Sequence, residues 1–217
     1  MFLHIQNVLT PEEIAFFRQS LGADAPWVDG ARSAGGQALH QKNNLQLSQA
    51  SELSAQLQAK VKAAVHRSAL FFSAALPRRI FNPLFNNYGD GTNHYGNHVD
   101  SAVMHSKADG CWVRSDLSCT LFLTPPEDYD GGELVLEGTD GETPVKLAAG
   151  SLVLYATGYK WSCKYAADYF EWKGGRPQLY LSIFRRQQSG TLPPSMKRSA
   201  SCCSRSCARA GAGWRAR

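Results

Sequence analysis

One histidine and one aspartate, two residues apart, are the side chains of this sequence best suited to chemistry. His98 and Asp100 end a polar run, broken by glycines, that begins at Tyr88. On an extended strand, residues at this spacing project to the same face, so an imidazole nitrogen and a carboxylate oxygen can meet one small cation. With a second histidine, such a pair forms the 2-His-1-carboxylate triad of non-haem Fe(II) sites. Alone, His-x-Asp is a weak motif that arises often on ordinary surface strands.

The residues that follow this pair predict the sheet that would hold it. Residues 115–124, 133–137 and 151–155 are short β-rich runs, separated by proline, aspartate and glycine turn signals. This pattern is typical of an all-β sandwich or jelly roll. Residues 128–132 carry two consecutive glycines, which predict a tight hairpin with positive φ angles. The fold class is therefore mainly β, with supporting helices.

The first third of the chain predicts two helices. Thr10-Pro11-Glu12-Glu13 is a capping box with proline at the first helical position, so a helix begins there and ends at Gly22. A second helix is predicted over residues 51–75 by the spacing of its leucines and valines. We expect both to pack on one outer face of the sandwich. The Gly/Ser/Ala-rich segment that ends near Gln41 is either a lid or a simple connection.

Length and charge indicate one domain with an appendage. The 217 residues divide into a helical support region (1–77), a β core (78–187) and a basic tail (188–217). The formal charge is +5, but the residues from Gly190 onward hold six basic side chains and no acidic one. The remainder has 17 basic and 18 acidic residues, a net charge of −1, so nucleic-acid binding by the body is disfavoured.

Cysteine usage and hydropathy favour a cytoplasmic protein. The six cysteines do not follow a disulfide pattern, and half of them lie in the tail. The amino terminus does not resemble a signal peptide, and the sequence contains no long apolar run, so we expect no membrane association. The oligomeric state is left open by the sequence.

Several motifs in one order are far more specific than the His-x-Asp pair. They resemble the sequence motifs of the PKHD-type hydroxylases, the prolyl-4-hydroxylase-like family of Fe(II)/2-oxoglutarate dioxygenases. The resemblance covers residues 1–155. The motifs are Lys42-Asn43-Asn44, Leu84-Phe85-Asn86, Tyr95-Gly96-Asn97-His98-Val99-Asp100, Asp116-Leu117-Ser118, Tyr129-Asp130-Gly131-Gly132-Glu133-Leu134 and Leu152-Val153-Leu154-Tyr155.

The resemblance implies a double-stranded β-helix and a hydroxylase. Oxygen would be inserted into a C–H bond of a small-molecule or peptidyl substrate, while 2-oxoglutarate and dioxygen give succinate and CO2. His98 and Asp100 would bind Fe(II), and Arg176, Tyr88 and Tyr95 would bind 2-oxoglutarate. Ascorbate (vitamin C) often assists such enzymes.

The second histidine of the triad is missing where the resemblance places it. It should follow Tyr155 by a few residues, but Trp161 holds that position and no histidine follows His105. An indole nitrogen is a donor only and cannot bind iron. Cys163 could in principle supply a thiolate. A catalytically inactive jelly-roll relative, or a truncated product, is therefore the alternative function.

The tail departs from the family as well. It is rich in Ser, Cys, Arg, Ala and Gly and shows neither helical nor strand periodicity. We hypothesise that the chain leaves the reading frame of the family after Tyr155. A basic tail for RNA or acidic membranes and a cysteine-rich zinc site are the rival hypotheses.

Overall fold

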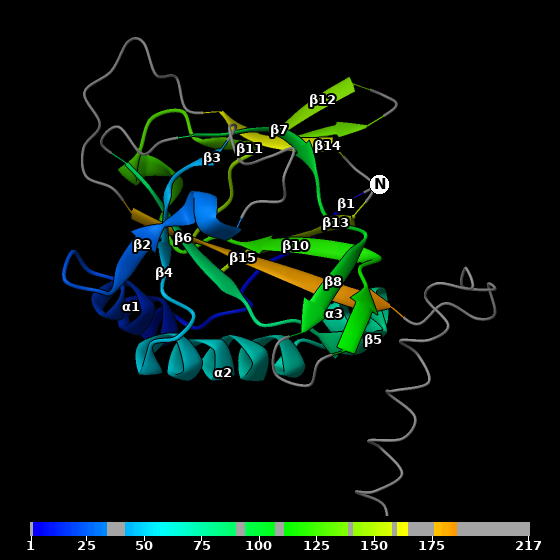
Figure 1. Ribbon diagram of the computed structural model, residues 1–217, viewed down its shortest axis with the longest axis horizontal. Helices are drawn as coiled ribbons and strands as arrows, with labels where there is room; N and C mark the ends of the chain where they lie inside the picture. The colour runs from blue at the N-terminus through cyan, green and yellow to red at the C-terminus, as the bar shows by residue number, and fades with distance from the viewer. Residues whose placement is uncertain are drawn as a thin grey trace, which may run out of the picture.

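The structure of the chain is a computed structural model that describes residues 2–33, 42–89, 94–106, 111–138, 141–157, 160–164 and 176–185. Within these ranges, strands form a large and a small sheet, and three helices accompany them (Figure 1). None of the described helices is long and apolar enough to cross a membrane.

The predicted capping box is confirmed at helix α1 (Pro11–Ser20). The N–H of Glu13 donates to Thr10 Oγ1 (3.3 Å), and the N–H of Thr10 donates to Glu13 Oε2 (3.0 Å). Two N-terminal helices were expected, however, and that number is wrong: the predicted second helix is divided into α2 (Glu52–Arg67) and α3 (Ala69–Ala75). Ser68 lies between them in an extended conformation, and its hydroxyl accepts the N–H of Phe71, which caps a new helix.

The large sheet has the strand order β1–β13–β10–β15–β6–β4–β2, with β5 paired to β15. Each pair of neighbouring strands in this sheet runs antiparallel. Its strands are β1 (Phe2–Ile5), β2 (Trp27–Asp29), β4 (Leu45–Leu47), β5 (Pro77–Ile80), β6 (Leu84–Tyr88), β10 (Leu117–Leu121), β13 (Leu152–Ala156) and β15 (Arg176–Arg185).

The small sheet has the order β12–β11–β14–β7–β3, so β7 lies between β14 and β3. A separate hairpin pairs β8 with β9, and short 3-10 helices η1 and η3 lie at Gly30–Ser33 and Pro126–Asp128. The remaining strands are β3 (Lys42–Asn43), β7 (His94–Val99), β8 (Val103–Ser106), β9 (Cys111–Arg114), β11 (Glu133–Gly138), β12 (Gly141–Val145) and β14 (Lys160–Lys164).

The hairpin predicted at residues 128–132 is wrong. β10 belongs to the large sheet and β11 to the small one, so this segment carries the chain from one sheet to the other. Gly131 and Gly132 do have positive φ angles, 64° and 70°. The local conformation was thus predicted correctly, but the pairing of the strands on either side depends on distant partners.

The main core lies between the helices and the large sheet. Phe17, Leu57 and Phe71 from the helices share one buried cluster with Phe85 and Leu121 from the strands. A second cluster, with Phe122, Leu134, Leu136, Val145, Val153 and Tyr155, joins the two sheets. The first 77 residues contribute β1, β2 and β4 to the large sheet and β3 to the small one, in addition to their helices.

Candidate functional site

A bulge in β7 aims the candidate histidine. Trp161 on β14 lies opposite His98, and Cys163 lies opposite Tyr95, so three steps along β7 match two along β14. An extra residue of this kind bends a strand and redirects its side chains. The rings of Tyr95 and His98 are consequently stacked, with centroids 3.6 Å apart.

A hydrogen bond to the backbone determines which nitrogen of the His98 imidazole carries the proton. His98 Nδ1 donates to the carbonyl oxygen of Gly96 at 2.7 Å, which leaves the lone pair on Nε2. Burial lowers the pKa of His98, although the Gly96 hydrogen bond and the charge of Asp100 act in the opposite direction. The neutral ring, with Nε2 as acceptor, is the form that binds a metal ion.

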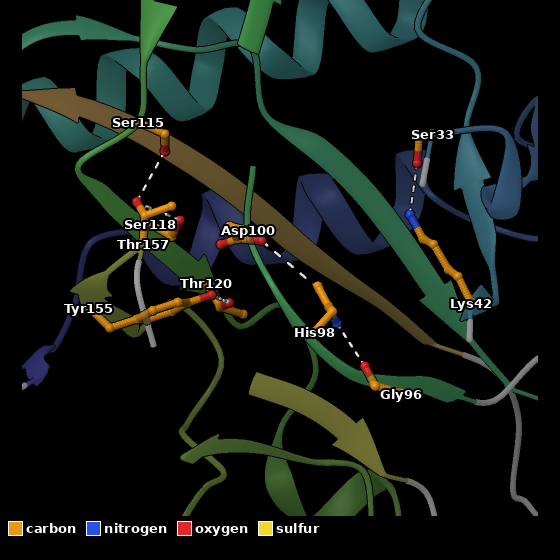
Figure 2. Close-up of polar contacts among 10 residues, drawn as sticks. All are labelled: Ser33, Lys42, Gly96, His98, Asp100, Ser115, Ser118, Thr120, Tyr155 and Thr157. Carbon is orange, nitrogen blue, oxygen red and sulfur yellow. Dashed lines mark hydrogen bonds and ion pairs between the residues drawn. The ribbon is translucent and has the colours of Figure 1, made fainter. Parts of the chain in front are cut away.

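Asp100 lies beside that nitrogen. Its Oδ1 atom is 4.0 Å from His98 Nε2, and the two side chains are only 12% and 8% exposed (Figure 2). Asp100 Oδ2 is buried, and no described residue donates a hydrogen bond to it. A buried carboxylate is unfavourable unless a cation or donor compensates for the lost water. An imidazole nitrogen and a carboxylate in this position fit two ligands of an Fe(II) ion.

No histidine lies on β14 opposite the candidate pair. Residue 161, whose backbone pairs with His98, is a tryptophan. No group of three His, Cys, Asp or Glu residues that could hold a metal ion occurs in the described ranges. His94 begins β7 as an exposed residue, and His105 packs against Trp112 on the β8–β9 hairpin. The described residues therefore fit two protein ligands.

The residues expected to bind 2-oxoglutarate come from both sheets. Tyr88 is buried in a small cluster with Tyr129, and Tyr95 packs against that cluster. Arg176 begins β15, and its backbone lies opposite Tyr88. Burial, together with the charge of Asp100, raises the pKa of Tyr95 to about 12, so its hydroxyl stays protonated and can donate a hydrogen bond.

A row of buried hydroxyl groups was missed by the sequence analysis. Ser115 Oγ lies 3.1 Å from Thr157 Oγ1, Ser118 Oγ lies 3.4 Å from the same atom, and Thr120 Oγ1 lies 3.5 Å from Tyr155 Oη (Figure 2). Ser118 and Thr120 alternate with Cys119 and Leu121, which face the main core. Polar residues at period two on a strand this apolar are the signal that could have identified them.

Comparisons with known proteins identify the family of the chain. The sequence pattern of the 2OG-Fe(II) oxygenase superfamily matches residues 83–166. A PKHD-type hydroxylase of Variovorax paradoxus (strain S110) is 54% identical over 155 residues, which are 71% of this chain and 68% of the relative. A PKHD-type hydroxylase of Verminephrobacter eiseniae (strain EF01-2) is 41% identical over 212 residues, 90% of this chain and 93% of the relative.

Solved structures show the same fold. A prolyl-4-hydroxylase of Pseudomonas putida superposes with a TM-score of 0.55 at 17% identity, over 85% of this chain and 92% of that one. The expected jelly roll is thereby confirmed. The chain belongs to the PKHD-type hydroxylase family of Fe(II)- and 2-oxoglutarate-dependent oxygenases.

Proposed function

We propose that this protein hydroxylates a C–H bond with Fe(II) held by His98 and Asp100. The observation that carries the proposal is the buried pair itself: a neutral imidazole whose Nε2 lone pair lies beside a carboxylate, 4.0 Å away, with one oxygen that no described donor satisfies. When bound, Fe(II) with 2-oxoglutarate and dioxygen supplies the oxidant, and 2-oxoglutarate becomes succinate and CO2.

The side chains of the protein would position the metal and the co-substrate. The Gly96 carbonyl holds the His98 ring in one tautomer and one orientation, as partners of metal-binding histidines commonly do. We assign the distal carboxylate of 2-oxoglutarate to Arg176, because a guanidinium can donate two parallel hydrogen bonds to it. The hydroxyls of Tyr88 and Tyr95 would add donors to the same ligand.

We infer that the iron has only two protein ligands. The register of β14 supports this, since it puts Trp161 where the second histidine of a triad would stand. Cys163 pairs with Tyr95, further along β7 from His98, and is the weaker candidate for a third donor. A site with fewer fixed ligands is less preorganised, so Fe(II) should exchange readily.

Further properties are proposed from the family and the composition. The acceptor is a small molecule or a peptidyl group, and ascorbate supports turnover by keeping iron reduced. The free, buried thiol of Cys119 supports a reducing, cytoplasmic setting. The near-neutral body gives no support to nucleic-acid binding.

Succinate formation tests the proposed function. Purified protein is incubated with Fe(II), 2-oxoglutarate and ascorbate, with and without oxygen, and succinate is measured by mass spectrometry. We expect slow, oxygen-dependent succinate release from the wild type even without an acceptor, and none from Asp100→Asn, which keeps the shape of the side chain. A wild-type rate no higher than that of Asp100→Asn would contradict the proposal and favour a catalytically inactive relative. The tryptophan at position 161 supports that alternative, whereas the comparisons with known proteins do not.

A further inference from the structure

Lys42 is a buried cation that the proposed chemistry has not used. The residue is 9% exposed, and its ammonium donates to Ser33 Oγ at 2.8 Å (Figure 2). The same nitrogen lies 5.0 Å from the centroid of the Tyr95 ring. In the described part of the chain, no carboxylate lies within ion-pair distance of it. Burial lowers the pKa of Lys42 to about 8, against the opposing influence of Asp29 and Asp100.

The pairing of β3 with β7 places Lys42 next to the candidate site. Lys42 on β3 lies directly opposite Tyr95 on β7. Tyr95 in turn stacks on His98, so one aromatic ring separates the ammonium from the imidazole that would bind iron. The hydroxyl that holds the ammonium comes from η1, at Ser33.

Such an arrangement is unfavourable for stability alone. A buried ammonium loses its water, and a hydroxyl together with a ring face restores only part of that loss. A methionine would fill the same space without the charge. An ammonium next to a hydroxyl offers the donors that a carboxylate accepts, and charge-assisted hydrogen bonds of this kind are strong when desolvated.

We propose that Lys42 is a carboxylate-binding residue of the active site, a cationic anchor on the small sheet in addition to Arg176 on the large one. This inference rests on the proposed function. The carboxylate could belong to 2-oxoglutarate or to the acceptor, and the chemistry that Lys42 offers is the same for both. The two sources differ in when the carboxylate arrives, which makes them separable by experiment.

Lysine side-chain NMR tests the proposal directly. The full-length protein is labelled with 13Cε/15Nζ-lysine and loaded with diamagnetic Zn(II), and Lys42→Met identifies the resonance of Lys42. 2-Oxoglutarate is added first, followed by acetate at saturating 2-oxoglutarate. A Lys42 shift with 2-oxoglutarate assigns the carboxylate to the co-substrate, and a shift only with acetate assigns it to the acceptor. A silent Lys42 in both additions would overturn the proposal.

Lys60 provides a matched control within the same spectrum. It is also a lysine over an aromatic ring, 4.5 Å from the centroid of Phe16, but it is exposed on α2. Its resonance should not move in either addition. If Lys60 moves as much as Lys42, the shifts report general ionic effects, and the proposal is overturned.

Binding constants separate this role from a structural one. If the carboxylate is that of 2-oxoglutarate, Lys42→Met should weaken 2-oxoglutarate binding to the Zn(II) protein by about 10- to 100-fold, as loss of a charged hydrogen bond does. Lys42→Arg should recover part of the affinity, and Lys60→Met should change nothing. A purely structural Lys42 would instead lower the unfolding temperature of Lys42→Met and leave ligand affinity unchanged in the folded protein.

The outcome is independent of whether the chain turns over. The metal-free protein gives a further acetate titration, in which Lys42 can still shift if the succinate assay of the wild type fails. Succinate from the wild type with a silent Lys42 would sink this inference alone. A Lys42 shift without succinate would sink the proposed reaction and leave the anion site standing.

Discussion

The two strands that flank β7 differ in what they bring to the site. On one side, β3 supplies Lys42, a buried cation that lies over the ring of Tyr95, and that ring stacks on His98. On the other side, β14 places Trp161, which has no metal-binding atom, opposite His98. The two candidate ligands themselves lie on or directly after β7, and their local geometry is set by its bulge. The metal pair therefore depends on one strand, whereas completion of the site depends on its neighbours.

The largest effect is expected from β7 itself. His98→Ala removes one of two protein ligands, so Fe(II) affinity should fall by at least ~100-fold, more than the loss of an outer partner of a ligand usually causes. Metal titration of the purified variants measures this, and His105→Ala on the β8–β9 hairpin is the control. Equal affinities in wild type and His98→Ala would mean that iron binds elsewhere.

The burial of Lys42 on β3 can be tested through the pH dependence of the free energy of unfolding. The pKa of Lys42 is about 8 in the folded protein and 10.5 in the unfolded chain, so the unfolded state binds more protons between these values. The wild type should therefore gain stability relative to Lys42→Met as the pH rises from about 8 to 10.5, by on the order of 2–3 kcal/mol. Below pH 8 the difference should be constant.

Urea unfolding at several pH values gives this comparison, with Lys60→Met as the control. A difference that does not change with pH would show that Lys42 is hydrated or ion-paired in the folded protein, and would remove the energetic argument for an anion site on the β3 side.

A glycine beneath β3 gives a test of how that strand is positioned. A Cβ atom on Gly30 would lie 2.0 Å from Asn44 Oδ1 and 2.8 Å from Asn44 O. Gly30→Ala must push back the segment that follows Lys42, which we expect to destabilise the protein by about 2 kcal/mol. At Gly22 the nearest atom is 3.6 Å away, so Gly22→Ala should be nearly neutral. Thermal unfolding of both variants distinguishes the two positions, and equal losses would contradict this packing argument.

The β14 side is tested by supplying the missing ligand. Trp161→His puts an imidazole opposite His98, and Fe(II) affinity should rise by at least about tenfold, since a direct ligand contributes more than an outer partner. Trp161→Phe removes the indole without adding a donor and should leave the affinity unchanged. If both variants bind Fe(II) alike, position 161 does not face the metal.

Local signals predicted the elements better than their partners. The capping box at Thr10 is confirmed because its hydrogen bonds join residues three apart. His98 and Asp100 were predicted as a pair from their spacing and the surrounding motifs, and their side chains do lie near each other. The burial of Lys42 was missed, since it depends on Ser33 and Tyr95, and the bulge between Tyr95 and His98 is visible only against β14. The break at Ser68 was missed because a serine inside a predicted helix indicates only a low helix propensity, whereas here it caps a new helix.

The carboxyl-terminal part of the chain is where the sequence departs from its relatives. Several PKHD-type relatives match 155 or 156 residues, and the relative that matches 212 residues does so at lower identity. The predicted tail (188–217) lies outside the described residues, as do residues 34–41 of the segment predicted as a lid or a connection. Our hypothesis that the chain leaves the family's reading frame after Tyr155 is tested by resequencing the gene: a neighbouring frame should encode a histidine near position 161, and its absence would contradict the hypothesis.

The number of imidazoles on the iron is the most direct test of a metal site with His98 and Asp100 as its two protein ligands. The Fe(II) protein with 2-oxoglutarate is treated with nitric oxide, and electron spin echo modulation is recorded with natural and 15N-labelled histidine. We expect one coordinated imidazole, that of His98. It should disappear in His98→Ala, and Trp161→His should have two. Two imidazoles in the wild type would show that another histidine completes the site, and none would show that the His98–Asp100 pair does not bind iron.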